Sequence, residues 1–115
     1  LAVAIGTAHG FYVGEPVLDK ERVAEIAAKV KAPLVLHGAS GLSESDVREC
    51  VSKGMCKVNF ATELRVAYTD AVKKLLAEAP KTYDPKKLGL VATEAVKEQV
   101  IARMKMCGCV GKAFV

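Results

Sequence analysis

The sequence predicts an α/β fold in which short buried strands alternate with amphipathic helices. Three apolar runs, at residues 1–5, 33–37 and 56–59, are separated by segments with apolar residues at helical spacing. Such alternation with short connections is typical of right-handed βαβ units and a parallel sheet. Three strands alone leave open sheet edges, and the closed barrel of this type has eight strands in about 250 residues. We therefore expect one partial domain over residues 1–115, the C-terminal part of a TIM (β/α)8 barrel with about three βα units and a terminal helix.

The first predicted strand, residues 1–5, is an uninterrupted apolar run that ends at Gly6. This composition is typical of a strand buried on both faces of a parallel sheet. The run at 33–37 repeats the pattern, and the run at 56–59 is a weaker case. Because the chain begins inside an apolar run and without an initiator Met, we expect it to be a piece of a longer polypeptide.

Two helices are predicted between the strands. Asp19 can cap the first helix, and Pro33 prevents its continuation. Ser43 can cap the second, with Asp46 at the third position as an approximate capping box, and Gly54 is placed to end it.

Two longer helices are predicted to follow the third strand. Thr62 is expected to cap one of them, which stops before Pro80. Asp84 and Pro85 form a cap and a first-turn proline for the other. Residues 79–88 are therefore expected to connect the two helices.

Composition excludes several classes of function. The 17 Lys and Arg residues exceed the 13 Asp and Glu residues by only four, and they form no long basic run, so we expect no nucleic-acid partner. Apolar stretches fall far short of the roughly 18 to 20 residues that cross a bilayer, so we expect no membrane partner. Without a secretion signal, the four cysteines are interpreted as reduced thiols.

Both histidines follow predicted strands, and each precedes a glycine. His9 follows the first strand and His37 ends the second. The carboxyl ends of neighbouring parallel strands meet at one edge, where two imidazoles can reach one divalent ion. The alternative is a hydrogen-bonded or surface role for each ring, and a catalytic zinc site needs a third protein ligand in either case.

The loops after the second and third strands predict an anion site. Gly38, Ala39 and Ser40 have little bulk to keep an anion from the main chain, and Thr62 opens a helix whose amides carry the positive dipole end. In barrels of this type the last two loops often bind phosphate. Alternatively, the glycines serve only the turn and Thr62 only caps its helix.

Asn59 is a further polar residue at a strand end, and two roles remain open for it. Its amide can bind a substrate oxygen, or it can tie two loops together. Cys107 and Cys109 are separated by one residue, which differs from the usual two-residue spacing of thiol metal and redox sites.

Three motifs together resemble one enzyme family. Residues 6–10 read GTAHG, residues 36–41 read LHGASG, and CKVN at 56–59 is followed by ATEL at 61–64. In this order and separation they resemble the C-terminal part of the class II, metal-dependent ketose-bisphosphate aldolases, which include the fructose- and tagatose-bisphosphate enzymes. The resemblance extends over essentially the whole chain.

The resemblance implies a zinc aldolase that reversibly cleaves a ketose 1,6-bisphosphate to dihydroxyacetone phosphate and glyceraldehyde 3-phosphate. It makes His9 and His37 two of three histidine ligands, and Asn59 a catalytic residue that orients the dihydroxyacetone portion. Zinc polarises the ketone. The phosphate is expected to lie among residues of the three strand-end loops: Gly10, Gly38, Ala39, Ser40, Asn59, Phe60, Ala61 and Thr62.

The same resemblance implies a cytoplasmic homo-oligomer, dimer or tetramer, with a monovalent cation near the phosphate. The third ligand and the proton donor lie upstream in the family and are absent from this sequence. Phe60 replaces the expected Val or Ile, and Ala61 stands where some fructose-bisphosphate enzymes have Asp, which favours the tagatose-type branch. Two alternatives remain: a non-catalytic phosphosugar-binding or assembly module, and a metal-dependent phosphosugar isomerase or epimerase.

Overall fold

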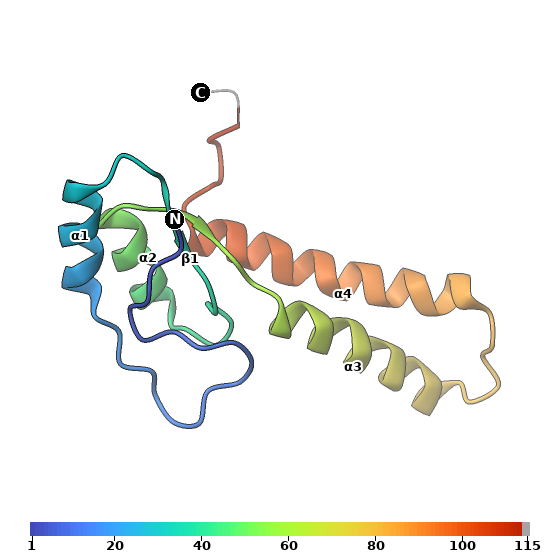
Figure 1. The fold of residues 1–115 in the computed structure, drawn as a ribbon. Helices are drawn as coiled ribbons and strands as arrows, with labels where there is room; N and C mark the ends of the chain where they lie inside the picture. The colour runs from blue at the N-terminus through green and yellow to red at the C-terminus, as the bar shows by residue number, and fades with distance from the viewer. Residues whose placement is uncertain (114–115) are drawn as a thin grey trace.

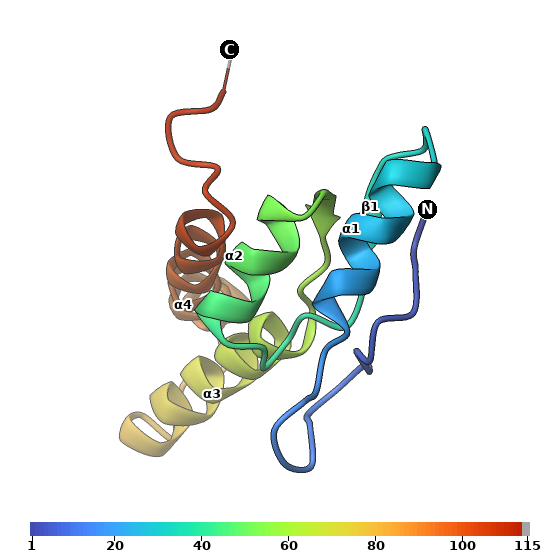
Figure 2. The same cartoon turned by 90° about the vertical axis from the view of Figure 1, so that its left-hand side faces the viewer.

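A computed structural model describes residues 1–113 and contains four helices and a small parallel sheet within this range. The order is α1 (Lys20–Lys29), β1 (Leu34–Leu36), α2 (Glu44–Ser52), β2 (Met55–Val58), α3 (Thr62–Glu78) and α4 (Pro85–Met106). In Figures 1 and 2, α1 and α2 lie beside the strands, and α3 and α4 form a long pair that projects away from them. This confirms the predicted α/β fold.

The predicted strand at residues 1–5 is wrong in extent. Ala2 forms an isolated parallel bridge with Val35, and the Val35 amide donates to the Leu1 carbonyl at 2.9 Å. Further along, the Ile5 carbonyl accepts from the Asp19 amide at 2.9 Å instead of from β1. Because β1 is only three residues long, it offers few ladder positions, and the segment departs after one bridge.

The strands β1 and β2 pair in parallel with a shift in register. Leu34 pairs with Met55, whereas Val35 pairs with Lys57, so Cys56 is an extra residue on β2. An extra residue changes which face the following side chains occupy. Accordingly Met55 is buried in the core, while Cys56 and Lys57 are both exposed.

Three of the predicted helix caps are confirmed. The side chain of Asp19 accepts from the Arg22 amide at 3.1 Å, and Ser43 accepts from the Asp46 amide at 3.1 Å. Asp84 accepts from the Lys86 amide at 2.9 Å, directly before Pro85. Each bond satisfies an amide that has no partner within its own helix.

The prediction that Thr62 caps α3 is wrong. The helix begins at Thr62 itself, Ala61 is the N-cap residue, and no side-chain cap is formed. The methyl group of Ala61 cannot accept a hydrogen bond, so the first amides of α3 are left for other partners.

The core lies between the sheet and the two helices that cover it. Leu34 and Leu36 of β1 pack with Val23 of α1 and with Val47 and Cys50 of α2, and none is more than 1% exposed. Burial of each large aliphatic side chain contributes about 1.5 to 3 kcal/mol. Burial also raises the pKa of the Cys50 thiol. All four cysteines are free, which agrees with reduced thiols.

An ion cluster joins α1 to α2 on the outside of this core. Lys20 Nζ lies 2.6 Å from Glu49 Oε2 and 3.0 Å from Asp46 Oδ1. These bonds raise the pKa of Lys20 and lower the pKa of Glu49. The pKa of Asp46 is lowered first by the hydrogen bond from Ser43 and then by the one from Lys20. The cluster therefore fixes the two helices relative to each other in their charged states.

The pair of α3 and α4 makes the molecule elongated. Its radius of gyration is 17.2 Å, against about 13 Å for a compact domain of this length. The predicted connection between the two helices is confirmed, but it spans residues 79–84 instead of 79–88, because Pro85 already begins α4. Several apolar side chains on the pair are exposed: Val66, Tyr68, Leu76, Leu90, Val100, Ile101 and Met104. Within residues 1–113, no helix combines the length and apolar composition needed to cross a bilayer.

Candidate functional site

The two histidines lie side by side. The ring centroids of His9 and His37 are 5.7 Å apart, with an interplanar angle of 63°. Two imidazoles that share one tetrahedral zinc ion at about 2.0 to 2.1 Å hold their centroids about 5 Å apart. The observed separation therefore fits two ligands of one ion. Within residues 1–113, no third His, Cys, Asp or Glu side chain completes a metal-binding group with them.

Tyr12 connects the loops that carry the two histidines. Its hydroxyl accepts from the Ala8 amide at 3.0 Å and donates to the Gly38 carbonyl at 2.7 Å. Gly38 has a φ of +64°, and a Cβ there would lie 2.4 Å from the Ala8 carbonyl oxygen. Only glycine permits this close approach. Sequence reasoning missed Tyr12, because its spacing from the motifs carries no signal of the contact.

Ser40 connects the β1 loop to the start of α3. Its side chain is buried, and its Oγ accepts from the amides of Ala61 at 3.2 Å and Thr62 at 3.1 Å. Two accepted bonds use both lone pairs, which leaves the hydroxyl proton free to donate. A free hydroxyl beside an uncapped helix N-terminus favours an anion.

Asn59 lies between a lysine and a histidine. Its Oδ1 accepts from Lys57 Nζ at 2.7 Å, and its Nδ2 lies 3.0 Å from His37 Nδ1 and 3.4 Å from His37 Nε2. The main chain holds Asn59 in place, since its amide donates to the Leu36 carbonyl at 2.9 Å and its carbonyl accepts from the Ala39 amide at 3.3 Å. Asn59 therefore links β2 to the loop of His37.

A pocket of about 490 Å³ collects most of the predicted site residues. Among the described residues that line it, Arg65 carries a permanent positive charge and none is a carboxylate. Sequence reasoning missed Arg65, although its position one helical turn after Thr62 was an available signal. The lining residues are His9, Gly10, His37, Gly38, Ser40, Asn59, Ala61, Thr62 and Arg65.

Two predicted phosphate residues do not line this pocket. Ala39 is 1% exposed and belongs to the core. Phe60 packs against the core and lines a second cavity beside α4, where the Arg103 guanidinium lies 5.6 Å from its ring centroid. The first pocket thus brings together the other eight predicted residues.

The Glu63 carboxylate also faces Arg103, with Oε1 3.3 Å from Nε but outside hydrogen-bond geometry.

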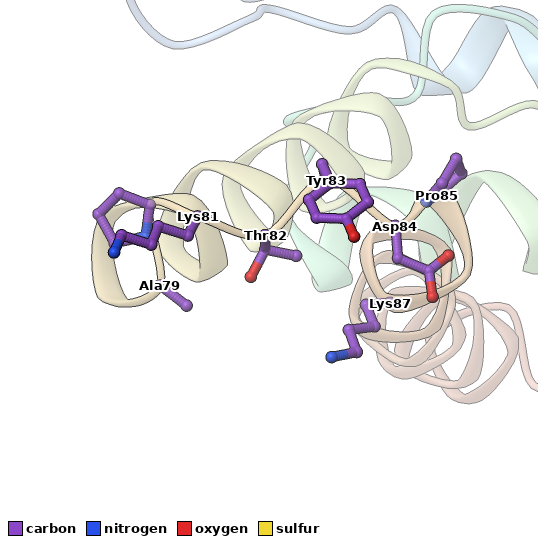
Figure 3. A pocket seen from close by; sticks show the side chains of 8 residues that line it. Ala79, Lys81, Thr82, Tyr83, Asp84, Pro85 and Lys87 are labelled. Atoms are coloured by element: carbon purple, nitrogen blue, oxygen red, sulfur yellow. The ribbon is translucent and has the colours of Figure 1, made fainter.

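A larger concavity of about 740 Å³ lies at the connection between α3 and α4. Figure 3 shows Lys81, Thr82, Tyr83, Asp84 and Lys87 around it. Tyr83 is 90% exposed, and this tip of the helix pair is remote from the start of α3 in Figure 1. Neither histidine lines it. We therefore place the candidate chemistry in the pocket of His9 and His37.

Comparison with known proteins identifies the family. Residues 1–112 match the family model described as fructose-bisphosphate aldolase class-II. The crystal structure of the YdjI aldolase from Escherichia coli K12 is 41% identical, with a TM-score of 0.85 over 97% of this chain and 40% of that chain. A putative fructose-1,6-biphosphate aldolase from Coccidioides immitis is 30% identical, with a TM-score of 0.80 over 97% of this chain and 39% of that chain.

A more distant structure shows the same fold. Fructose-bisphosphate aldolase (Fba) from Campylobacter jejuni is 20% identical, with a TM-score of 0.81 over 96% of this chain and 40% of that chain. The chain thus spans about 40% of the length of the structures it matches, which agrees with part of a barrel. Because the family model covers nearly the whole sequence, the chain belongs to the class-II fructose-bisphosphate aldolase family.

Proposed function

We propose that this chain supplies the metal and phosphate side of a class II aldolase site. The reaction is the reversible cleavage of a ketose 1,6-bisphosphate, fructose or tagatose, to dihydroxyacetone phosphate and glyceraldehyde 3-phosphate. The observation that carries the proposal is the 5.7 Å separation of the His9 and His37 rings beside the uncapped start of α3. Family membership supports the reaction class.

His9 and His37 would hold zinc together with a ligand from outside this chain. When bound, zinc acts as a Lewis acid toward the substrate carbonyl. The imidazoles must be neutral to ligate, so zinc binding by this pair competes with protons. The centroid distance supports this assignment, because it matches the spacing of two imidazoles on one ion.

The chain's other residues bind and orient the substrate. Ser40 donates its free hydroxyl proton to a phosphate oxygen, while its Oγ accepts from the Ala61 and Thr62 amides and so stands at the positive end of the α3 dipole. The Arg65 guanidinium adds positive charge at the same pocket. Asn59 Nδ2 donates to an oxygen of the dihydroxyacetone portion, and a monovalent cation can assist near the phosphate.

We also propose a cytoplasmic homo-oligomer, dimer or tetramer. The four free thiols support a reducing compartment. The exposed apolar side chains of Leu90, Ile101 and Met104 on α4 support contact with another subunit. Light scattering of the intact protein tests this part, and a monomer at micromolar concentration would contradict it.

The test of the function is cleavage of fructose and tagatose 1,6-bisphosphate by the intact zinc-loaded protein, with both triose phosphates measured. We expect carbon–carbon cleavage that is lost after chelation and lost in His37→Ala. Lys73→Met, an exposed side chain of α3, is the control and should retain activity. Phosphosugar binding without cleavage would instead support the non-catalytic module, and an isomerised product would support the isomerase.

A further inference from the structure

Tyr12 is hydrogen-bonded to residues directly beside both histidines. Its hydroxyl accepts at 3.0 Å from the amide of Ala8, which precedes His9. It donates at 2.7 Å to the carbonyl of Gly38, which follows His37. The two bonds use the acceptor and the donor of one phenol group. The hydroxyl therefore connects two main-chain segments that each carry one imidazole ring.

This connection lies where the main chain provides none. Ala2 forms the bridge to β1, and the segment then departs from the sheet before it reaches the first histidine. Among the residues that the structure describes, no main-chain hydrogen bond joins residues 4–10 to residues 36–41. The hydrogen bonds between the two histidine loops are thus supplied by the Tyr12 side chain.

The Tyr12 ring is itself fixed by packing. It lies against Gly41, where an added Cβ would meet the ring carbon Cδ2 at 3.4 Å, and it packs against the hydrophobic core. Its neighbours Phe11 and Val13 are exposed instead. Tyr12 therefore anchors the loop that precedes α1, and its hydroxyl is held in place between the two histidine loops.

We propose that Tyr12 is a positioning residue that sets the separation of the His9 and His37 rings before a metal binds, and thereby raises the affinity of this pair for zinc. The inference deepens the proposed function and rests on it for the identity of the metal. A site whose ligands are already in place loses less conformational freedom on binding. Tyr12 does not line the pocket, so it acts through the two loops and not on the substrate.

The first experiment measures the zinc affinity of the intact protein by competition with a chelator. Replacing a residue that supports metal ligands typically costs 10- to 100-fold in metal affinity. We expect about a tenfold loss in Tyr12→Phe, which keeps the ring and removes the hydroxyl. A zinc affinity within about twofold of the wild type would overturn the proposal.

Tyr83→Phe is the matched control, because it removes the same atom from a side chain that is 90% exposed at the connection between α3 and α4. It should leave the zinc affinity unchanged. Should Tyr12→Phe fail to fold, 4-fluorophenylalanine at position 12 replaces it in every measurement. Its fluorine fills most of the volume of the hydroxyl but has no proton to donate.

A double-mutant cycle separates the positioning of a ligand pair from a general loosening of the fold. A residue that acts by holding two rings at one separation loses its effect when one ring is removed. In the His9→Ala background, Tyr12→Phe should therefore add less than about a twofold loss of zinc affinity. An equal loss in both backgrounds would show that Tyr12 does not act on the pair.

The metal-free protein tests the placement of the rings without zinc. The centroids of His9 and His37 are 5.7 Å apart, so we expect a nuclear Overhauser effect between their ring protons in the wild type. The effect should weaken in Tyr12→Phe and persist in Tyr83→Phe. Its absence from the wild type, or an unchanged intensity in Tyr12→Phe, would overturn the proposal.

These outcomes differ from those that test the proposed function. A wild-type protein that binds zinc through His9 but cleaves no ketose bisphosphate contradicts the function, and the affinity comparison still decides the role of Tyr12. Conversely, cleavage by the wild type together with equal zinc affinities of the wild type and Tyr12→Phe retains the function and overturns the role of Tyr12.

Discussion

His9 and His37 hold their imidazole rings 5.7 Å apart between centroids, although a complete helix, α1, separates them in sequence. The proximity follows from the parallel alignment of residues 1–2 with β1, which brings the two following loops to one edge of the sheet. The Tyr12 hydroxyl then ties these loops together through Ala8 and Gly38. Two potential ligands are thus placed together by the alignment of the main chain and by the Tyr12 side chain.

Replacing Ser40 should affect phosphate more than zinc. Ser40→Ala removes a hydroxyl that bonds the Ala61 and Thr62 amides, and it removes one donor to the phosphate. A hydrogen bond to a charged group contributes about 1.5 to 3 kcal/mol, so the affinity for dihydroxyacetone phosphate should fall about tenfold or more. Calorimetric titration of the intact protein with this ligand and with zinc measures both affinities.

Ser52→Ala is the control for that comparison, because the Ser52 hydroxyl donates to the Glu49 carbonyl of its own helix, away from the pocket. It should change neither affinity. A Ser40→Ala protein that loses zinc more strongly than phosphate would contradict the assignment of Ser40 to the anion site.

Two glycine replacements should have opposite effects on stability. Gly38→Ala places a Cβ 2.4 Å from the Ala8 carbonyl oxygen at a φ of +64°, and a left-handed conformation alone costs about 1 to 2 kcal/mol. Gly89→Ala meets no atom within 4 Å inside α4 and should stabilise by about 0.5 to 1 kcal/mol. Thermal unfolding of the intact variants measures both, and equal shifts would show that the approach of Gly38 to Ala8 is not tight.

Acid should weaken the contact between α1 and α2. The pKa values of Asp46 and Glu49 are lowered, so both carboxylates favour the folded state once they are ionised. Their contribution is present above the ordinary pKa values, about 3.9 and 4.3, and is lost as the pH falls from there through the lowered ones. Lys20→Met should therefore lower the melting temperature at neutral pH and reduce its decline in acid.

Lys97→Met is the control, since Lys97 pairs with Glu94 3.0 Å away on the exposed surface of α4. Surface pairs of this kind contribute little, so its acid profile should match the wild type. Parallel profiles for Lys20→Met and the wild type would show that Lys20 does not set this dependence.

The helix-cap predictions that the structure confirms rest on interactions between residues close together in the sequence. Asp19, Ser43 and Asp84 were identified as caps because each bonds an amide two or three residues ahead, which requires no knowledge of the fold. The prediction of Thr62 as a cap is wrong because α3 begins at Thr62 itself, which leaves Ala61 in the N-cap position. The predicted extent of the strand at residues 1–5 is wrong because the number of paired residues also depends on β1, which is three residues long.

The site residues that could be predicted from the sequence are polar residues that directly follow a predicted strand. His9, His37 and Asn59 follow apolar runs, and parallel strands bring such positions to one edge. Lys57 was not predictable as a partner of Asn59, because its facing depends on the register shift at Cys56. Tyr12 was not predictable either, since its two hydrogen bonds depend on the conformation of the loop that precedes α1.

Anomalous diffraction at the zinc edge, from crystals of the intact zinc-loaded protein, tests the shared metal centre most directly. The account predicts one peak between the rings, with one nitrogen of His9 and one nitrogen of His37 each about 2.0 to 2.1 Å from it. A zinc peak bound to neither ring, or to only one of them, would contradict the account.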